Sequence, residues 1–254
     1  MALFRWGHGA RPASALTALL RALLPALLPS SCALCAQACA GVVCPACQRD
    51  SVIARPRCPR CANPMPALEA AAGRCCGACL ASRPAYDSTI AAADYAAPLD
   101  QLLLQLKFAA RLQLAPWFAQ LLRDAILQQS SRGARLPDVI APVPLGRRRL
   151  AERGFNQALE VAKPLARMLG VPLSPQLAAR VIETAPQSTV APAMRAANVH
   201  AAFAVAPGSL AGLHVALVDD VMTSGRTLDA LARACKAAGA AKVSNYVVAR
   251  TPPA

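Results

Sequence analysis

Two adjacent carboxylates, Asp219 and Asp220, directly follow an apolar run that ends at Val218. A loop of small hydroxyl residues around one glycine comes next, at 223–227, and a helical pattern begins after it. Backbone N–H groups and the positive end of the helix dipole together bind anions at such a helix start. The carboxylates would repel the anion itself, so they suit neutral or cationic groups attached to it, such as ribose hydroxyls or a magnesium ion.

This combination resembles the phosphoribosyl pyrophosphate (PRPP) motif of type I phosphoribosyltransferases. The resemblance implies that Asp219 and Asp220 hold the ribose hydroxyls of PRPP, with Mg²⁺ present, and act in catalysis, while the loop wraps the 5′-phosphate. The residues assigned to PRPP are Asp219, Asp220, Val221, Met222, Thr223, Ser224, Gly225, Arg226 and Thr227. Other α/β domains, such as response-regulator folds, also end a strand in acidic residues, but the Thr-Ser-Gly-x-Thr sequence favours the phosphate site.

Strands and helices alternate around this motif. Apolar runs predict strands at 87–95, 138–145, 178–182, 213–218 and 243–249, and helical patterns cover 99–129 (broken near Pro116), the segment up to Leu169, and 227–238. Such alternation predicts a parallel α/β sheet with flanking helices. Ligands bind these sheets at the carboxyl ends of the strands, which is where the acidic pair lies.

Arginines are the candidate contacts for the pyrophosphate group. Arg149 and Arg153 follow the predicted strand 138–145, where a pyrophosphate loop is expected. Arg195 falls in a Pro-containing segment that we expect to form a lid over the site. Departing pyrophosphate needs cations, and Arg groups and magnesium supply them. For each arginine, the competing interpretation is a solvated surface position.

Four Cys-x2-Cys pairs lie between residues 32 and 79. Each pair can present two thiolates from one tight turn, and two pairs complete a tetrahedral zinc site. The candidate ligands are Cys32, Cys35, Cys44, Cys47, Cys58, Cys61, Cys76 and Cys79. Sequential pairing gives one zinc site from the first two pairs and another from the last two, and crossed pairing also fits the spacing. Iron–sulfur ligation is the alternative chemistry. Cys39 fits no pair, and Cys75 competes with Cys76.

The cysteine segment has little else to stabilise it. Residues 30–80 contain no Phe, Tyr or Trp, so metal is expected to hold this segment together. The lack of aromatic residues also argues against a base-stacking platform for single strands. Its arginines, Arg49, Arg55, Arg57 and Arg60, suit either a nucleic-acid backbone or, as we favour, a solvated face on a structural module.

The chain is basic, with 27 Lys and Arg against 13 Asp and Glu and a formal net charge of +14. That balance is a modest indication of polyanionic partners. Residues 16–28 carry leucines at helical spacing, but Arg21 and Pro25 interrupt them, so we expect a short amphipathic helix and no membrane span. We also expect a cytoplasmic protein, in which paired cysteines bind metal and do not form disulfides.

The order of motifs along the chain is similar to that of the competence protein ComF family, which includes GntX-like DNA-utilisation proteins. The similarity rests on the paired cysteines, Pro142–Leu145, Arg153–Gln157, then Gln187, Arg195, Asn198 and Phe203, and finally the PRPP motif. It covers nearly everything from Cys32 to Arg250, and departs at Gly146, where a His is common in the family. It implies a link to DNA uptake in natural transformation or to use of DNA as a nutrient.

The sequence thus predicts an N-terminal amphipathic helix at 1–29, a double zinc-ribbon module at 30–84 and a type I phosphoribosyltransferase-like domain at 85–254. Three functions remain open. The first is an enzyme that transfers ribose phosphate to a base or amine. The second is a non-catalytic sensor of PRPP or a nucleotide. The third is a protein that handles single-stranded DNA alongside DNA-uptake proteins.

Overall fold

A computed structural model describes residues 30–131, 133–181 and 202–252 of the chain. The chain divides into two compact units, of which the first ends at Cys47 and the second begins at Gln48. No helix within the described ranges is long and apolar enough to cross a membrane.

The first unit contains the antiparallel strands β1 (Ser30–Ser31) and β2 (Ala38–Cys39) and the start of helix α2 (Pro45–Ser51). The predicted amphipathic helix at 1–29 and the predicted lid residue Arg195 lie outside the described residues.

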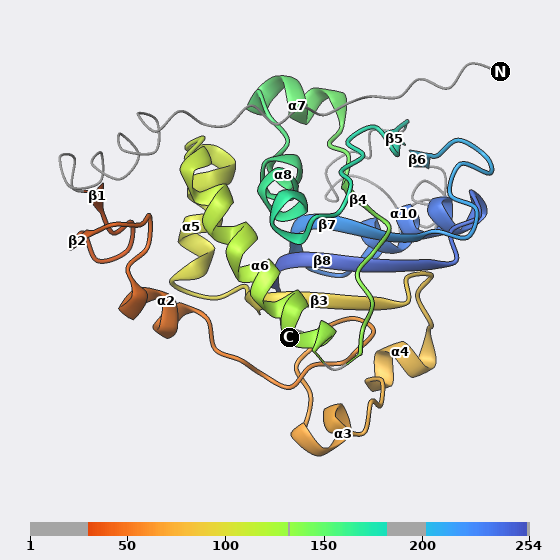
Figure 1. The fold of residues 1–254 in the computed structure, drawn as a ribbon, viewed down its shortest axis with the longest axis horizontal. Coiled ribbons are helices and arrows are strands. Elements are labelled where there is room, and N and C mark those ends of the chain that lie inside the picture. The colour runs from red at the N-terminus through yellow and green to blue at the C-terminus, as the bar shows by residue number, and fades with distance from the viewer. Residues whose placement is uncertain (1–29, 132, 182–201, 253–254) are drawn as a thin grey trace, which may run out of the picture. The chain divides into compact units, whose positions relative to one another are not determined.

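A parallel sheet of four strands forms the centre of the second unit (Figure 1). Its order is β3 (Ser88–Asp94), β8 (Lys242–Arg250), β7 (His214–Met222) and β4 (Val139–Pro142), and all neighbours run parallel. The predicted parallel sheet is confirmed. The strand predicted at 213–218 is too short, because β7 keeps its main-chain pairing with β8 beyond the point where its side chains cease to be apolar.

Helices cover both faces of this sheet (Figure 1). Helices α6 (Ala115–Ser130) and α8 (Gln157–Leu169) pack on one face, and α10 (Arg226–Ala237) packs on the other. The predicted break near Pro116 is confirmed, since α5 (Leu99–Phe108) ends before a 3-10 turn and Pro116 lies in the first turn of α6. Proline is tolerated there because the first helical N–H groups have no partner within the helix.

The shorter elements of the second unit are α3 (Ala67–Ala71), α4 (Gly77–Ala81), α7 (Arg147–Arg153), β5 (Ala179–Arg180) and β6 (Phe203–Ala204). Strands β5 and β6 pair antiparallel with each other. Helix α3 precedes Cys76 in the chain and helix α4 directly follows it, so both helices belong to the predicted zinc-ribbon region.

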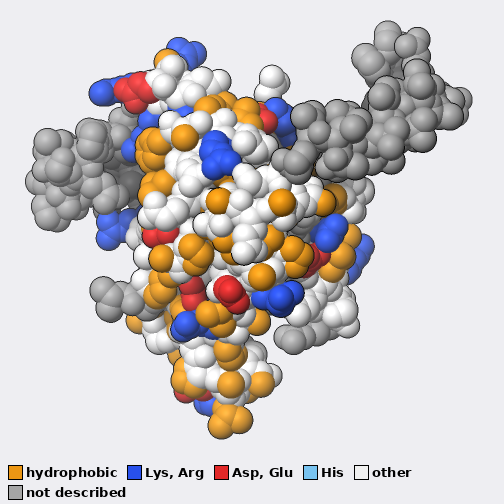
Figure 2. All heavy atoms as spheres, turned by 90° about the vertical axis from the view of Figure 1, so that its left-hand side faces the viewer, with side chains coloured by type: hydrophobic (Ala, Val, Ile, Leu, Met, Phe, Trp, Pro, Cys, Tyr) orange, Lys and Arg blue, Asp and Glu red, His pale blue; other side chains and the backbone are white. Residues whose placement is uncertain are grey.

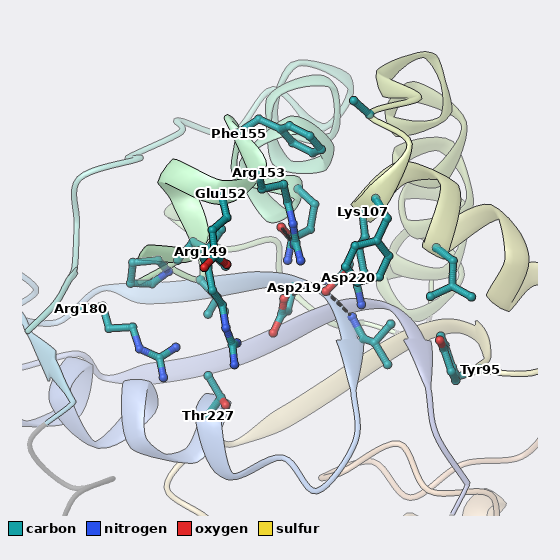
Figure 3. Close-up of a pocket in the computed structure, with 18 residues that line it drawn as sticks. Tyr95, Lys107, Arg149, Glu152, Arg153, Phe155, Arg180, Asp219, Asp220 and Thr227 are labelled. Atoms are coloured by element: carbon teal, nitrogen blue, oxygen red, sulfur yellow. Dashed lines mark hydrogen bonds and ion pairs between the residues drawn. The ribbon is translucent and has the colours of Figure 1, made fainter. Parts of the chain in front are cut away.

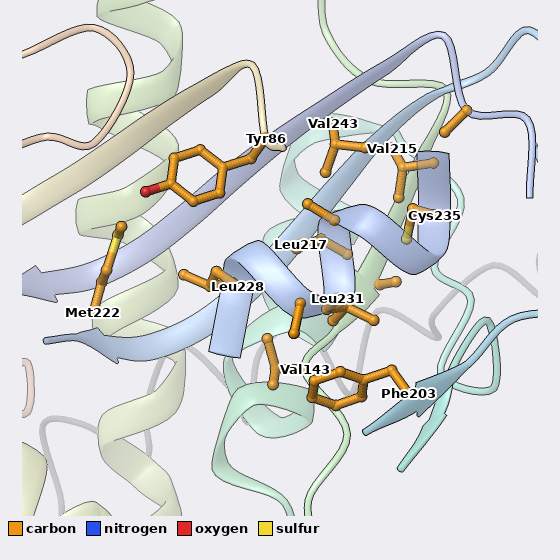
Figure 4. Close-up of a cluster of buried hydrophobic side chains, with 14 of the residues drawn as sticks. Tyr86, Val143, Phe203, Val215, Leu217, Met222, Leu228, Leu231, Cys235 and Val243 are labelled. Carbon is orange, nitrogen blue, oxygen red and sulfur yellow. The ribbon is translucent and has the colours of Figure 1, made fainter. Parts of the chain in front are cut away.

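One continuous apolar cluster fills the α10 face of the sheet (Figure 4). Leu228 and Leu231 of α10 are fully buried there against β7 and β8. Truncating one such leucine to alanine typically costs about 2–5 kcal/mol. Three cysteines of the predicted second zinc site, Cys58, Cys61 and Cys79, belong to this same cluster. The second half of the cysteine segment is therefore part of the core that carries the acidic pair and the loop at 223–227.

Candidate functional site

The eight paired cysteines form two groups, in each of which the four sulfur atoms lie within 4.8 Å of one another. One group contains Cys32, Cys35, Cys44 and Cys47, and the other Cys58, Cys61, Cys76 and Cys79. The pairing is thus sequential and not crossed. Neither Cys39 nor Cys75 belongs to a group.

The sulfur geometry fits zinc in both groups. Four thiolates about 2.3 Å from a tetrahedral zinc ion lie about 3.8 Å from one another. The Sγ atoms of Cys35 and Cys44 are 3.8 Å apart, and those of Cys61 and Cys76 are 3.5 Å apart. Burial opposes ionisation of Cys32, but backbone N–H donors outweigh it and lower the pKa of this thiol to about 6. In the second group, burial again opposes ionisation, but backbone N–H donors lower the pKa of Cys58 to about 7. A thiolate is the form that binds metal.

We expect the purified protein to hold two zinc ions per chain, as measured by elemental analysis of undenatured protein. Cys44→Ser and Cys58→Ser should each remove one of them. Because Cys58 is 1% exposed within the α10-face cluster, its variant should also lower the melting temperature of the second unit, whereas Cys44→Ser should not. One ion or none in the unaltered chain would contradict the two-site interpretation.

Three of the four module arginines make contacts inside the second unit. Arg55 and Arg57 both form ion pairs with Asp94 at the end of β3, at 3.0 and 2.7 Å. Arg60 donates to the backbone oxygen of Tyr86 at 3.1 Å. These contacts hold the zinc-ribbon segment against the sheet, as expected for a structural module. Arg49 and Arg55 are exposed, in agreement with a solvated face, whereas Arg57 and Arg60 are partly buried and engaged and so do not belong to it.

A cavity of about 800 Å³ lies at the carboxyl ends of the strands (Figure 3). Its walls include Tyr95 after β3, 143–145 after β4, Asp219 to Val221 on β7, and Thr227 in the first turn of α10. Parallel sheets place ligands at this edge. Figure 2 faces the side on which the strands end, where basic and acidic side chains are interspersed with apolar ones.

The two aspartates have different surroundings. Asp220 is 3% exposed, and its Oδ2 lies 2.7 Å from Nζ of Lys107 on α5. Asp219 is less buried, and its Oδ1 accepts a hydrogen bond from the backbone N–H of Asp220. Successive residues of a strand point in opposite directions, so the carboxylates diverge. Asp219 is therefore the more accessible hydrogen-bond acceptor, while Lys107 neutralises the charge of Asp220. Lys107 belongs to no motif, so sequence reasoning missed it.

The loop between β7 and α10 is shaped around Gly225. This residue is the N-cap of α10 with φ of 77°, a left-handed conformation that favours glycine. Thr223, Ser224 and Thr227 are exposed, whereas Met222 is buried beneath the loop. The exposed hydroxyls and the helix start can therefore receive an anion, and Met222 is a packing residue.

Arg149 and Arg153 lie on helix α7 and not in the predicted pyrophosphate loop. Gly146 and a left-handed Gly154 bound this helix, which places Arg149 and Arg153 one turn apart on the cavity wall. Arg153 donates to Gln157 Oε1 at 2.5 Å and lies 5.3 Å from the centre of the Phe108 ring.

A further arginine, Arg180 of β5, also lines the cavity. Figure 3 shows Arg149 and Arg180 pointing toward the side where Thr227 lies. Arg180 comes from a two-residue strand with no motif around it, so sequence reasoning missed it.

Binding at this cavity should depend on pH. Although part of the Asp219 side chain reaches the cavity, the surrounding protein withdraws the carboxylate from bulk water. This desolvation, and next the neighbouring Asp220 carboxylate, raise the pKa of Asp219 well above its usual range. As the pH falls through this raised pKa, Asp219 becomes protonated and loses acceptor strength, so affinity for PRPP should fall at a higher pH than an ordinary aspartate would give. Calorimetry across a pH series tests this. The Asp219→Asn variant is the control, because its remaining pH dependence reports the titration of PRPP itself. Identical pH profiles for the two proteins would contradict it.

Comparisons with known proteins agree with this geometry. Residues 155–253 match the phosphoribosyl transferase domain, and residues 23–80 match the double zinc ribbon domain. The purine phosphoribosyltransferase from Pyrococcus horikoshii Ot3 aligns over 53% of this chain and 83% of its own, with 19% identity and a TM-score of 0.33, and adds no further support.

Two relatives are similar over most of the chain. DNA utilization protein YhgH of Salmonella typhimurium is 37% identical over 197 residues, which cover 76% of this chain and 84% of the relative. Competence protein F of Haemophilus influenzae is 32% identical over 178 residues, which cover 69% of this chain and 78% of the relative. The chain therefore belongs to the competence protein ComF family, in which a double zinc ribbon precedes a phosphoribosyltransferase domain.

Proposed function

We propose that the cavity at the strand ends binds PRPP together with Mg²⁺. The observation that carries this proposal is the hydroxyl-rich loop at the start of α10, directly beside the accessible carboxylate of Asp219. The phosphoribosyl transferase domain match over 155–253 supports it. The 5′-phosphate is assigned to the loop 223–227, and the ribose hydroxyls to Asp219.

The cations of the cavity suit a departing pyrophosphate. Arg149, Arg153 and Arg180 line the same cavity as the acidic pair. As the bond from the ribose anomeric carbon to pyrophosphate breaks, negative charge grows on the leaving group and positive charge on the ribose. Prearranged guanidinium groups stabilise the first, and the Asp219 carboxylate stabilises the second. Magnesium, when bound, neutralises part of the pyrophosphate charge.

Aromatic rings in the cavity suit a planar acceptor. Phe108 and Phe155 both line it, and Phe108 is 74% exposed. Rings of this kind stack on nucleobases. We therefore propose transfer of ribose phosphate to a base as the reaction, with a non-catalytic PRPP sensor as the alternative.

Calorimetry with PRPP and Mg²⁺ tests binding, and release of pyrophosphate in the presence of a panel of bases and amines tests transfer. Binding with release of pyrophosphate supports the enzyme. Binding without any release, and without exchange of labelled pyrophosphate, supports the sensor. No binding with Mg²⁺ present contradicts both.

The biological role we propose is in the use or uptake of DNA, and it rests on the names of the two relatives. We propose that segment 30–84 binds metal and that segment 85–254 forms the cavity. We also propose that the protein acts in the cytoplasm. Deleting the gene should reduce transformation or growth on DNA, and a deletion strain with normal values for both contradicts the role. Single-stranded DNA binding that weakens with salt would support direct contact with DNA.

A further inference from the structure

Arg250, the last residue of β8, lies buried beneath the phosphate loop and is 5% exposed. Its Nη1 donates to the backbone oxygens of Met222, at 2.9 Å, and Thr223 at the start of the loop. Its Nε donates to the backbone oxygen of Cys61 at 3.0 Å. One guanidinium therefore joins a ligand of the second cysteine group to the chain that forms the phosphate site.

These bonds fix the direction of the loop's donors. A peptide unit is planar and trans, so its C=O and N–H point in opposite directions. Holding the Thr223 oxygen against Arg250 turns the N–H of Ser224 away from Arg250, toward the outer side of the loop. The Met222 oxygen, which also accepts from the Thr251 N–H at 3.0 Å, fixes the N–H of Thr223 in the same way. An anion site built of backbone N–H groups depends on this orientation.

The electrostatics link Arg250 to metal in the second group. Among the ion pairs of the described residues, none includes Arg250. A buried cation without a counter-charge is costly. Four thiolates around a zinc ion carry a net charge of about −2. The metal-loaded group beside Cys61 is thus the counter-charge available to this guanidinium.

A second set of contacts, around Tyr86, also joins the zinc-ribbon segment to the loop. Tyr86 is 4% exposed. A Cβ atom added to Gly225 would lie 3.2 Å from the Tyr86 hydroxyl oxygen, so the ring lies directly under the loop (Figure 4). The neighbouring Ala85 N–H donates to Asp229 Oδ1 in the first turn of α10 at 2.6 Å. Arg60, one residue before Cys61, holds the Tyr86 backbone oxygen.

We propose that Arg250 is a positioning residue that couples the second cysteine group to the phosphate loop, so that metal in this group raises the affinity of the loop for a phosphorylated ligand. The hydrogen bonds of Arg250 reach Cys61 of the second group, whereas the members of the first group all lie in the other compact unit, so the proposal assigns the coupling to the second group alone. The inference rests on the proposed PRPP site for its ligand, but its structural part concerns the loop alone.

Amide hydrogen exchange tests the loop without any ligand. Arg250→Lys keeps the charge but replaces the forked donor, and Cys76→Ser removes a partly exposed ligand of the second group. Both should speed exchange of the two amides that donate to the loop's carbonyl oxygens, Thr251 N–H to Met222 at 3.0 Å and Asp229 N–H to Gly225 at 2.9 Å, about tenfold or more, while the earlier residues of β7 stay protected. Cys44→Ser, in the first group, and Arg167→Lys, an exposed arginine of α8, serve as matched controls and should leave the loop unchanged.

The zinc affinity of the unaltered chain provides a test that needs no variant to fold. Coupling between equilibrium affinities is reciprocal, so PRPP with Mg²⁺ should raise the affinity for one of the two zinc ions by the factor with which zinc raises PRPP affinity, about tenfold, as measured by equilibrium competition with a chromogenic chelator. The Cys44→Ser protein, which keeps only the second group, should show this gain in affinity for its single ion.

The outcomes distinguish failure of the proposed PRPP site from failure of the proposed coupling. If the unaltered protein binds no PRPP, the proposed function fails, and hydrogen exchange still decides whether the loop depends on Arg250 and Cys76. If PRPP binds but neither exchange at the loop nor zinc affinity responds, the coupling is overturned while the PRPP site stands. If Cys44→Ser affects the loop as strongly as Cys76→Ser, the assignment to the second group is wrong.

Discussion

The double variant Asp219→Asn, Asp220→Asn should bind PRPP at least about tenfold more weakly than the unaltered protein. Asparagine keeps the shape of each side chain but removes its charge. Charge-assisted hydrogen bonds contribute about 1.5–3 kcal/mol each, so removing the charge from the Asp219 acceptor alone accounts for a tenfold effect. The measurement is calorimetric titration with PRPP in the presence of Mg²⁺.

The single variants should differ, because the two carboxylates have different partners. Asp219→Asn acts mainly on the ligand, since this carboxylate is the more accessible one. Asp220→Asn also leaves Nζ of Lys107 without the carboxylate that lies 2.7 Å away. A cation whose side chain is only 19% exposed is destabilising when it loses its counter-charge. We therefore expect Asp220→Asn to lower thermal stability as well as affinity, and Asp219→Asn to lower affinity alone.

Asp138→Asn is a matched control for both aspartate variants. Asp138 is an exposed carboxylate directly before β4, at the amino ends of the strands and thus away from the cavity. Its Oδ2 accepts a hydrogen bond from the N–H of His214. Affinity for PRPP should be unchanged in this variant. A double variant that binds PRPP as tightly as the unaltered protein would remove the acidic pair from the site.

Much of the cavity could be predicted from local sequence. The acidic pair and the loop are contiguous, and their chemistry depends on spacing that the sequence shows directly. The Cys-x2-Cys turns are equally local, which is why the sequence identified all eight members of the two cysteine groups. The choice between sequential and crossed pairing required the structure, because it depends on how separate turns approach one another.

The residues that were missed act at long range. Lys107 reaches Asp220 from a helix more than a hundred positions earlier in the chain, and Arg250 reaches back to Cys61. Single basic residues in a helix or at a strand end have no spacing that marks them. The α7 arginines were placed in a loop because a run of charge hides helical periodicity, whereas the two bounding glycines define the helix.

Gly225→Val should abolish PRPP binding while the sheet remains folded. Gly225 has φ of 77°, which costs a residue with a Cβ about 1–2 kcal/mol. A Cβ at this position would also lie 2.6 Å from Cε of Met222 and 3.2 Å from the Tyr86 hydroxyl, both beneath the loop. Either the Met222 side chain or the loop has to shift. Because Met222 is 2% exposed within the packed cluster, we expect the loop to move outward, into the space that the 5′-phosphate is proposed to occupy.

Gly170→Val separates backbone strain from this displacement. Gly170 ends α8 with φ of 66°, and a Cβ there would meet no atom within 4 Å. The two variants share the left-handed strain, but only Gly225→Val displaces the phosphate loop. Gly170→Val should therefore lose stability and keep its affinity for PRPP. Calorimetry with PRPP and Mg²⁺, together with circular dichroism to confirm the fold, distinguishes them. Equal PRPP affinity in the Gly225→Val variant and the unaltered protein would show that the phosphate does not bind at this loop.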